Sequence, residues 1–270
     1  MGRWPFFLLA LILLPSVADA GAWVQPSGHG QLIHTSSLYW TGESFDAHGA
    51  RQENPGFRKF ETNPYFEYGL NEKWTLGTSV FLHYLYQEEA AYGEAYSNYG
   101  AGNSEAFARY QILQENGFVL AAQPLVALPA HYRQKEAPTA GRPNWDGELA
   151  LLAGYGFTWR GLDHYVDAKA AYRHRLGVLQ DQWRFSATLG LGLTSSLQLI
   201  PELNWTQRLR EGGGAVSVAG QNDYDLLKAQ LSLVWQVNER HALQLGGFRH
   251  MAGKDTGAGG GLFIALWTQW

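Results

Sequence analysis

Hydrophobic and polar residues alternate one by one in many windows of the chain. Between Lys59 and Leu70 charged and polar residues fall on one set of alternate positions, and large apolar residues fall on most of the others. The same spacing runs from Trp74 to Tyr86 and from Leu149 to Trp159. A period of two over about ten residues predicts a β-strand with one apolar and one polar face. No helical spacing of comparable length competes with it, so the pattern predicts an all-β protein.

Turn residues divide these windows into twelve expected strands. The expected strands span residues 30–40, 57–70, 74–87, 100–114, 118–129, 147–159, 163–175, 182–194, 197–208, 223–237, 241–251 and 260–270. Tight turns such as 115–117 and 160–162 alternate with longer polar stretches such as 41–56 and 130–146. Short turns at one end and long loops at the other are typical of transmembrane barrels. We therefore expect a transmembrane, antiparallel up-and-down β-barrel of about twelve strands, with both termini periplasmic.

The composition excludes several other classes of protein. Only 16% of the 270 residues are charged, 46% are hydrophobic and 14% are aromatic. Abundant apolar residues argue against disorder, and beyond the N-terminus no apolar run approaches the roughly 20 residues of a membrane-spanning helix. The absence of cysteine excludes a disulfide scaffold or a thiolate metal site. A net charge of −4 gives no basic surface for nucleic acid, so we expect no nucleic-acid partner.

The first twenty residues have the three parts of a secretory signal peptide. Arg3 gives the positive charge, the stretch from Phe6 to Leu14 is apolar, and Ala18 and Ala20 flank Asp19 in a small-x-small cleavage site. A short membrane anchor is the alternative, but the apolar run is too short to span a bilayer. The sequence thus predicts a signal peptide over 1–20 and a barrel over 21–270, located in the outer membrane of a Gram-negative cell.

The end of the chain also alternates. Leu262, Ile264, Leu266 and Trp270 share one face, and the final residue is aromatic. This resembles the C-terminal signature strand of bacterial outer-membrane proteins. The resemblance implies recognition of this strand by the barrel assembly machinery, which makes that machinery and outer-membrane lipid expected partners.

Charged side chains fall on the polar faces of the expected strands. Because a charge on the lipid face near the midplane costs about 2–4 kcal/mol, the alternation places these side chains inside the barrel. The expected lumen-lining residues are Lys59, Glu61, Glu67, Glu105, Arg109, Glu148, Asp167, Lys169, Arg173, Arg184, Glu202, Arg208 and Lys228. Tryptophans near strand ends are expected to form girdles at the membrane interface. These are Trp40, Trp74, Trp159, Trp183, Trp235 and Trp270.

One hairpin carries a family resemblance. The segment Phe66–Gly77 resembles the E-x-G-L-T-D-x-W-x-L-G hairpin of a family of bacterial outer-membrane transporters named for the meta-pathway of phenol degradation, with Asn71 and Glu72 in place of Thr and Asp. Residues 100–104, where Asn103 replaces a common aspartate, and residues 121–129 resemble the segments that follow. The resemblance covers about 57–130. It implies a small barrel with a role in the uptake of hydrophobic or aromatic compounds.

Three functions follow from these observations. Eight strands enclose only side chains and sixteen leave an aqueous channel, so twelve fit a narrow channel or uptake protein for a small-molecule solute. A plugged structural or adhesive barrel is the main alternative. A lipid hydrolase using His34 and Ser36 is the third, because some barrel enzymes place His and Ser two residues apart; here Ser37 stands where those enzymes carry Asn. We expect no enzymatic activity, no metal and no cofactor.

Overall fold

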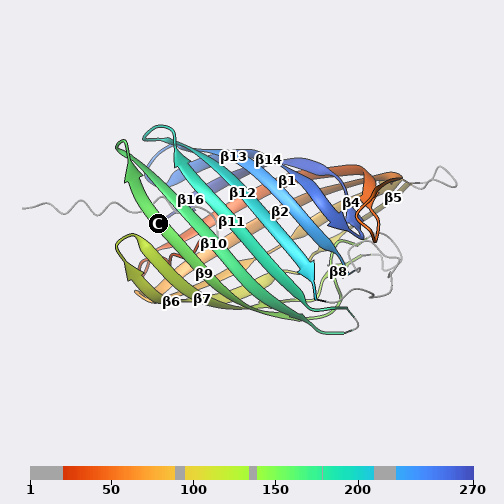
Figure 1. Ribbon diagram of the computed structural model, residues 1–270, viewed down its shortest axis with the longest axis horizontal. Helices are drawn as coiled ribbons and strands as arrows, with labels where there is room; N and C mark the ends of the chain where they lie inside the picture. The colour runs from red at the N-terminus through yellow and green to blue at the C-terminus, as the bar shows by residue number, and fades with distance from the viewer. Residues whose placement is uncertain (1–20, 89–94, 134–138, 178, 210–222) are drawn as a thin grey trace, which may run out of the picture.

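The chain forms a closed, twelve-stranded antiparallel β-barrel in the computed structural model (Figure 1). The structure describes residues 21–88, 95–133, 139–177, 179–209 and 223–270. Within these ranges every regular element is a strand. Across the same ranges no helix is long and apolar enough to cross a membrane.

The strands follow the expected order along the chain. They are β1 Gly30–Phe45, β2 Arg51–Asn71, β3 Trp74–Ser79, β4 Leu82–Glu88, β5 Ala95–Ala101, β6 Glu105–Glu115, β7 Phe118–Ala127, β8 His131–Tyr132, β9 Asp146–Trp159, β10 Leu162–Arg175, β11 Gln182–Gly192, β12 Leu197–Arg208, β13 Asp225–Gln236, β14 His241–Lys254, β15 Thr256–Gly257 and β16 Gly260–Gln269. β3 and β4 together pair along β2, and β5 and β6 continue one another in the same way. β1 closes the ring because it pairs with both β2 and β16.

Tight turns lie at one end of the barrel and longer connections at the other. Asn116 and Gly117 both have positive φ, at 50° and 83°, and Arg160 and Gly161 repeat the pattern at 52° and 75°. Two successive positive φ values define the two-residue turn that matches the twist of antiparallel strands. These turns were predicted from the sequence. The C-terminus lies at this short-turn end, on the left of Figure 1.

At the opposite end, which we call the rim, the strands run further than the alternation predicts. Residues 41–56 were expected to form a long loop, but β1 continues to Phe45 and β2 begins at Arg51. The Asp46 carboxylate accepts hydrogen bonds from the amides of His48 and Ala50 at 2.8 and 2.9 Å, which closes a tight turn between the two strands. Both faces are polar here, so the strand leaves no alternating signal in the sequence. The same correction applies to residues 95–99 and 252–254, which lie in strands.

Two of the expected strands are interrupted, each for an identifiable reason. β3 ends and β4 begins opposite Pro64, which has no N–H to donate across the sheet. On the next strand, residues 102–104 stand opposite only two residues, 80 and 81. One extra residue of this kind is a β-bulge, which re-aims side chains and bends the strand. The Asn103 side chain uses that freedom to bind the backbone of Leu128 and Arg142.

The polarity of the barrel is the reverse of that of a water-soluble protein. Leu149 and Leu262 are each 61% exposed on the outside. Glu67 and Arg109 are fully buried inside. Closure of the sheet into a ring leaves no unpaired strand edge, and the apolar exterior can contact hydrocarbon, so both conditions for crossing lipid with strands are met. The functional groups are therefore to be sought in the lumen.

Candidate functional site in the barrel lumen

The thirteen residues predicted to line the lumen are all buried or partly buried, whereas their neighbours along each strand are mostly more exposed. Ten of them take part in ion pairs, and several of these pairs connect strands that are far apart in the sequence. The ten are Lys59, Glu61, Glu67, Glu105, Arg109, Glu148, Lys169, Arg173, Arg184 and Arg208. Lys228 instead lies over the ring of Phe248 in a cation–π contact. Asp167 and Glu202 belong to no ion pair among the described residues.

Glu148 on β9 is the centre of the largest charged network. It lies 3.1 Å from the Lys169 ammonium, 2.8 Å from Nε of Arg173 and 2.9 Å from Nη1 of Arg184. Glu105 on β6 joins through Arg173 at 2.5 Å and Arg184 at 3.7 Å. Three cations share two carboxylates, so the network taken by itself carries one excess positive charge. The alternation predicts that these side chains point into the lumen. Which of them contact one another depends on the register between the strands.

A second pair is buried completely. Nη2 of Arg109 lies 2.7 Å from Glu67, and neither side chain is exposed. Nε of Arg109 donates to Gln123 at 2.9 Å, and the Tyr65 hydroxyl bonds to Glu67. A buried ion pair of this kind needs such extra hydrogen bonds because both charges have lost their water.

The lumen also holds the first described residues of the chain, 21–26, which we call the inner segment. Nη1 of Arg109 donates to the carbonyl of Trp23 at 2.8 Å. The amide of Gln25 donates to Thr75 at 2.7 Å, and its side-chain nitrogen donates to Glu67 at 2.9 Å. The inner segment is therefore fixed to β2, β3 and β6. The alternation of polar and apolar residues does not predict this feature, because the inner segment has no period of two.

The indole of Trp23 fixes the inner segment against the opposite wall. It meets the Tyr165 ring edge-on at a centroid distance of 6.0 Å. A β-carbon on Gly154 would lie 2.5 Å from the indole, so only glycine leaves room for the ring there. Trp23 also packs against an apolar cluster that includes Val119 and Leu152, both buried. The part of the lumen around Trp23 is thus closely packed and partly apolar.

Beside this packed region the lumen contains a polar cavity of about 150 Å³. It lies between β10, β11 and β12. Its polar lining consists of Asp167, Lys169, Arg184, Ser186, Thr188, Glu202, Asn204 and Thr206. Cations and carboxylates both face the cavity, which can therefore hold water or a small solute with hydrogen-bonding groups.

A histidine that the sequence analysis did not single out joins the lumen to a loop. Nε2 of His83 lies 2.7 Å from Glu61, which also binds Lys59 at 2.7 Å. Nδ1 of His83 lies 2.6 Å from the hydroxyl of Tyr132, and that hydroxyl donates to the carbonyl of Ala140 at 2.9 Å. This cluster connects the wall to the connection between β8 and β9.

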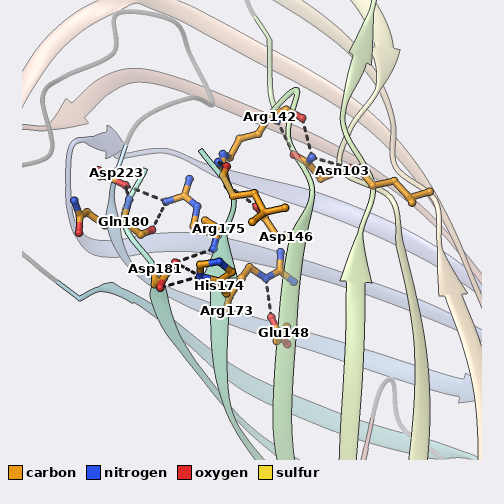
Figure 2. A network of polar contacts seen from close by, with 12 residues as sticks. Asn103, Arg142, Asp146, Glu148, Arg173, His174, Arg175, Gln180, Asp181 and Asp223 are labelled. Atoms are coloured by element: carbon orange, nitrogen blue, oxygen red, sulfur yellow. Dashed lines mark hydrogen bonds and ion pairs between the residues drawn. The ribbon is translucent and has the colours of Figure 1, made fainter. Parts of the chain in front are cut away.

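Arginines hold the longer connections at the rim (Figure 2). Nη1 of Arg142 binds Asp146 at 2.5 Å, and its Nη2 donates to the carbonyl of Leu176 at 2.7 Å. Arg175 binds Asp223 at 3.1 Å. Arg208 binds Asp255 at 2.7 Å, so this predicted lumen residue lies at the rim.

Asp181 completes the rim network (Figure 2). Burial acts to raise the pKa of its carboxyl. The hydrogen bonds from the Tyr172 hydroxyl, the Arg175 amide and the His174 ring act against it and hold the pKa below its ordinary value. Asp181 therefore stays ionised and orders the connection between β10 and β11.

The six predicted girdle tryptophans are all exposed. Trp74, Trp159, Trp183 and Trp235 lie at or next to strand ends, and Trp270 follows the last paired residue of β16. Trp40 does not lie at a strand end, because β1 continues five residues past it. Other aromatic rings, which were not among the predicted girdle residues, lie beside Trp183. Tyr172 and Phe185 contact Trp183, and Trp205 stacks on Phe185.

The hydrolase arrangement does not form. His34 is exposed, and its Nε2 lies 3.0 Å from the hydroxyl of Thr62 on β2. Among the described residues no carboxylate or amide side chain bonds to this ring, so nothing orients it toward Ser36 as a catalytic base. Across all the residues that the structure describes, no three His, Asp or Glu side chains come together in a way that could hold a metal ion.

Solved structures with a similar fold are outer-membrane barrels. An outer-membrane channel from Pseudomonas putida F1 matches with a TM-score of 0.66 at 15% identity, over 94% of this chain and 100% of that one. The KdgM porin matches at 0.53 and 8% identity over 88% and 98%, and the β domain of the Bordetella autotransporter Brka at 0.52 and 11% over 90% and 100%. No family model and no curated protein matches the sequence. The likeness thus shows the fold, and the phenol-pathway resemblance stays a prediction.

Proposed function

We propose that this protein is a narrow outer-membrane channel for small molecules. The observation that carries the proposal is a polar cavity of about 150 Å³ inside a closed barrel with an apolar exterior. A barrel that only anchors another domain has no need of charged groups of both signs along a cavity. The outer-membrane channel and the KdgM porin, which share the fold, are channels by their names.

The lining of the cavity gives the class of solute. Lys169, Arg184, Asp167 and Glu202 face it, so a solute must exchange hydrogen bonds with ionised groups as it passes. Molecules with their own polar groups meet that requirement and pure hydrocarbons do not. Aromatic compounds, which the hairpin resemblance implies, meet it when they carry a carboxylate or a hydroxyl.

The same proposal gives the cellular address. Cleavage after Ala20 by a signal peptidase and export through the inner membrane would leave a chain that begins at Gly21. The barrel would then sit in the outer membrane with the short-turn end facing the periplasm. The C-terminal strand that ends at Trp270 would be the segment recognised by the barrel assembly machinery.

Planar-bilayer recording on the purified barrel tests the proposal. We expect small, discrete conductance steps, because the inner segment and the Glu148 network narrow the lumen. The variant Trp23→Ala removes the ring that wedges the inner segment against Tyr165, and we expect larger steps from it. The surface variant Trp159→Ala, which removes an exposed tryptophan, is the matched control and should leave the step size unchanged.

A plugged structural barrel is the second candidate. It is favoured by the four hydrogen bonds that fix the inner segment to the lumen wall, from Ala22, Gln25 and Arg109. A silent bilayer with both the native barrel and Trp23→Ala, when each shows the gel mobility shift on heating that marks a folded barrel, would establish this reading and reject the channel.

A further inference from the structure

Among the described residues, two lumen carboxylates lie in no ion pair with a cation. The other lumen carboxylates each lie in an ion pair with a Lys, Arg or His side chain, and these are Glu61, Glu67, Glu105 and Glu148. Asp167 and Glu202 belong to no ion pair among the described residues, although both line the polar cavity. Asp167 is only 5% exposed, and a buried carboxylate requires compensation for the water it has lost.

The start of the inner segment lies against Asp167. The amide of Ala22 donates to Oδ2 of Asp167 at 2.7 Å. A β-carbon built on Gly21 would lie 3.3 Å from the same oxygen, so the α-carbon of Gly21 is next to the carboxylate. Gly21 and Ala22 are both buried.

We propose that Asp167, supported by Glu202 across the cavity, is the binding site for the free amino group of Gly21 in the processed protein. The proposal rests on the cleavage after Ala20 set out above. Hydrolysis of the Ala20–Gly21 peptide bond consumes one water, leaves a carboxylate on Ala20 and a primary amine on Gly21, and the amine takes up a proton. The resulting ammonium supplies the cation that Asp167 lacks.

With this assignment, cleavage of the signal peptide changes the charge at the start of the inner segment inside the lumen. Before cleavage, residue 21 offers an uncharged amide, so Asp167 is held by the amide of Ala22 and Glu202 by the side chains of Asn204 and Gln230, with no ion pair to either carboxylate among the described residues. After cleavage, an ammonium joins the hydrogen bond from Ala22 and draws the inner segment onto β10. Arg109 and Thr75 then hold the other end of the same segment. The ammonium thus adds an ionic contact to a segment that hydrogen bonds already hold at both ends.

Amine-selective acylation of the folded protein tests the proposal. An activated ester at pH 7 modifies α-amino groups before lysines, because their pKa of about 8 lies well below the lysine value of about 10.4. Intact mass first establishes that the purified chain begins at Gly21, and peptide mapping then gives the rate at that residue. We expect the rate in the folded barrel to be about tenfold or more below that in the heat-denatured protein, since only free, deprotonated amine reacts.

Variants separate ion pairing from simple burial. Asp167→Asn keeps the shape of the side chain and removes its charge, and we expect it to restore the reactivity of Gly21 several-fold while the heat-dependent gel shift is retained. Asp163→Asn is the matched control: it changes the same residue type four positions away on β10, where the side chain bonds to Thr158, and should leave the rate unchanged. Glu202→Gln should give an intermediate rate.

Three results would overturn the proposal: a chain that begins elsewhere, equal reactivity in the folded and denatured protein, or full protection in Asp167→Asn. Bilayer recording on the same preparation keeps the two proposals apart. A protected amine in a silent barrel rejects only the channel. A reactive amine in a conducting barrel rejects only the assignment of Asp167.

Discussion

The ring of Tyr165 occupies the space above Gly190 that a side chain would otherwise fill. The two residues are paired across β10 and β11, and a β-carbon on Gly190 would lie 1.8 Å from Cε1 of Tyr165. Phe107 covers Gly77 in the same way on β6 and β3. An aromatic ring over a glycine on the next strand fixes the register and shields the bare backbone. For Tyr165 it also sets the ring against Trp23.

Replacing this glycine is expected to destabilise the barrel. In Gly190→Ala the Tyr165 ring must turn away and loses its edge contact with Trp23, so we expect a loss of about 1–3 kcal/mol, as for other overpacked sites. Urea unfolding in detergent measures the change. Gly147→Ala is the control, because a β-carbon there meets nothing within 4 Å and should leave the midpoint nearly unchanged. Equal midpoints for the two variants would contradict the role of the ring.

The buried pair of Arg109 and Glu67 is expected to show strong coupling. Arg109→Met leaves Glu67 charged and unpaired in the interior, at a cost of about 3–5 kcal/mol. Removing both charges in Arg109→Met with Glu67→Leu should cost less than the sum of the single changes. A double-mutant cycle from unfolding free energies gives the coupling, and additive single effects would mean that the pair contributes nothing.

The order of the connection between β10 and β11 is expected to depend on acid. The pKa of Asp181 is lower in the folded protein than the roughly 3.9 of an unfolded aspartate. A depressed folded pKa contributes stability that is present above about pH 4 and is lost as the pH falls through the folded value. Hydrogen exchange of the Arg175 amide, which donates to Asp181 at 2.8 Å, should therefore speed up in acid.

The variant Asp181→Asn tests the source of that dependence. It should already show fast exchange at neutral pH, with little further change in acid. An acid transition that persists unchanged in Asp181→Asn would assign the effect to another carboxyl group.

The exterior of β9 provides a test of the membrane-facing surface. Leu151 is 56% exposed in the middle of the strand, and Leu151→Arg should cost about 2–4 kcal/mol when the barrel folds into lipid vesicles. Trp159→Arg, at the end of the same strand, should cost about 0–1 kcal/mol, since the penalty falls toward the interface. Similar costs at the two positions would place β9 outside the hydrocarbon.

Strand order, turns and the polar interior could be predicted because each depends on local pattern. Alternation places Glu105 and Arg109 on the inner face, and both are buried or partly buried. On β6, after the bulge at Asn103, the inward-facing residues have odd numbers. On β5, before the bulge, the even-numbered Asn98 is the buried residue. One inserted residue shifts the phase of every later position, and nothing in the composition of residues 100–104 reveals it.

Partner choice in the lumen could not be predicted either. That Arg109 binds Glu67, and that Glu148 gathers three cations, depends on the register between strands and on the size of the ring. The position of the inner segment could not be predicted for a different reason. Its position depends on contacts with Asp167 and Tyr165 on the far wall, which are distant in the sequence.

The burial of Ala22 has a practical consequence for handling the protein. Its side chain is 0% exposed, so a purification tag or fluorescent label fused directly before Gly21 would be attached next to the buried inner segment. The conductance recorded from such a fusion would depend on the added tag as well as on the lumen of the barrel. Reporter groups belong instead in the turn between Asp46 and Ala50, which projects into solvent at the rim.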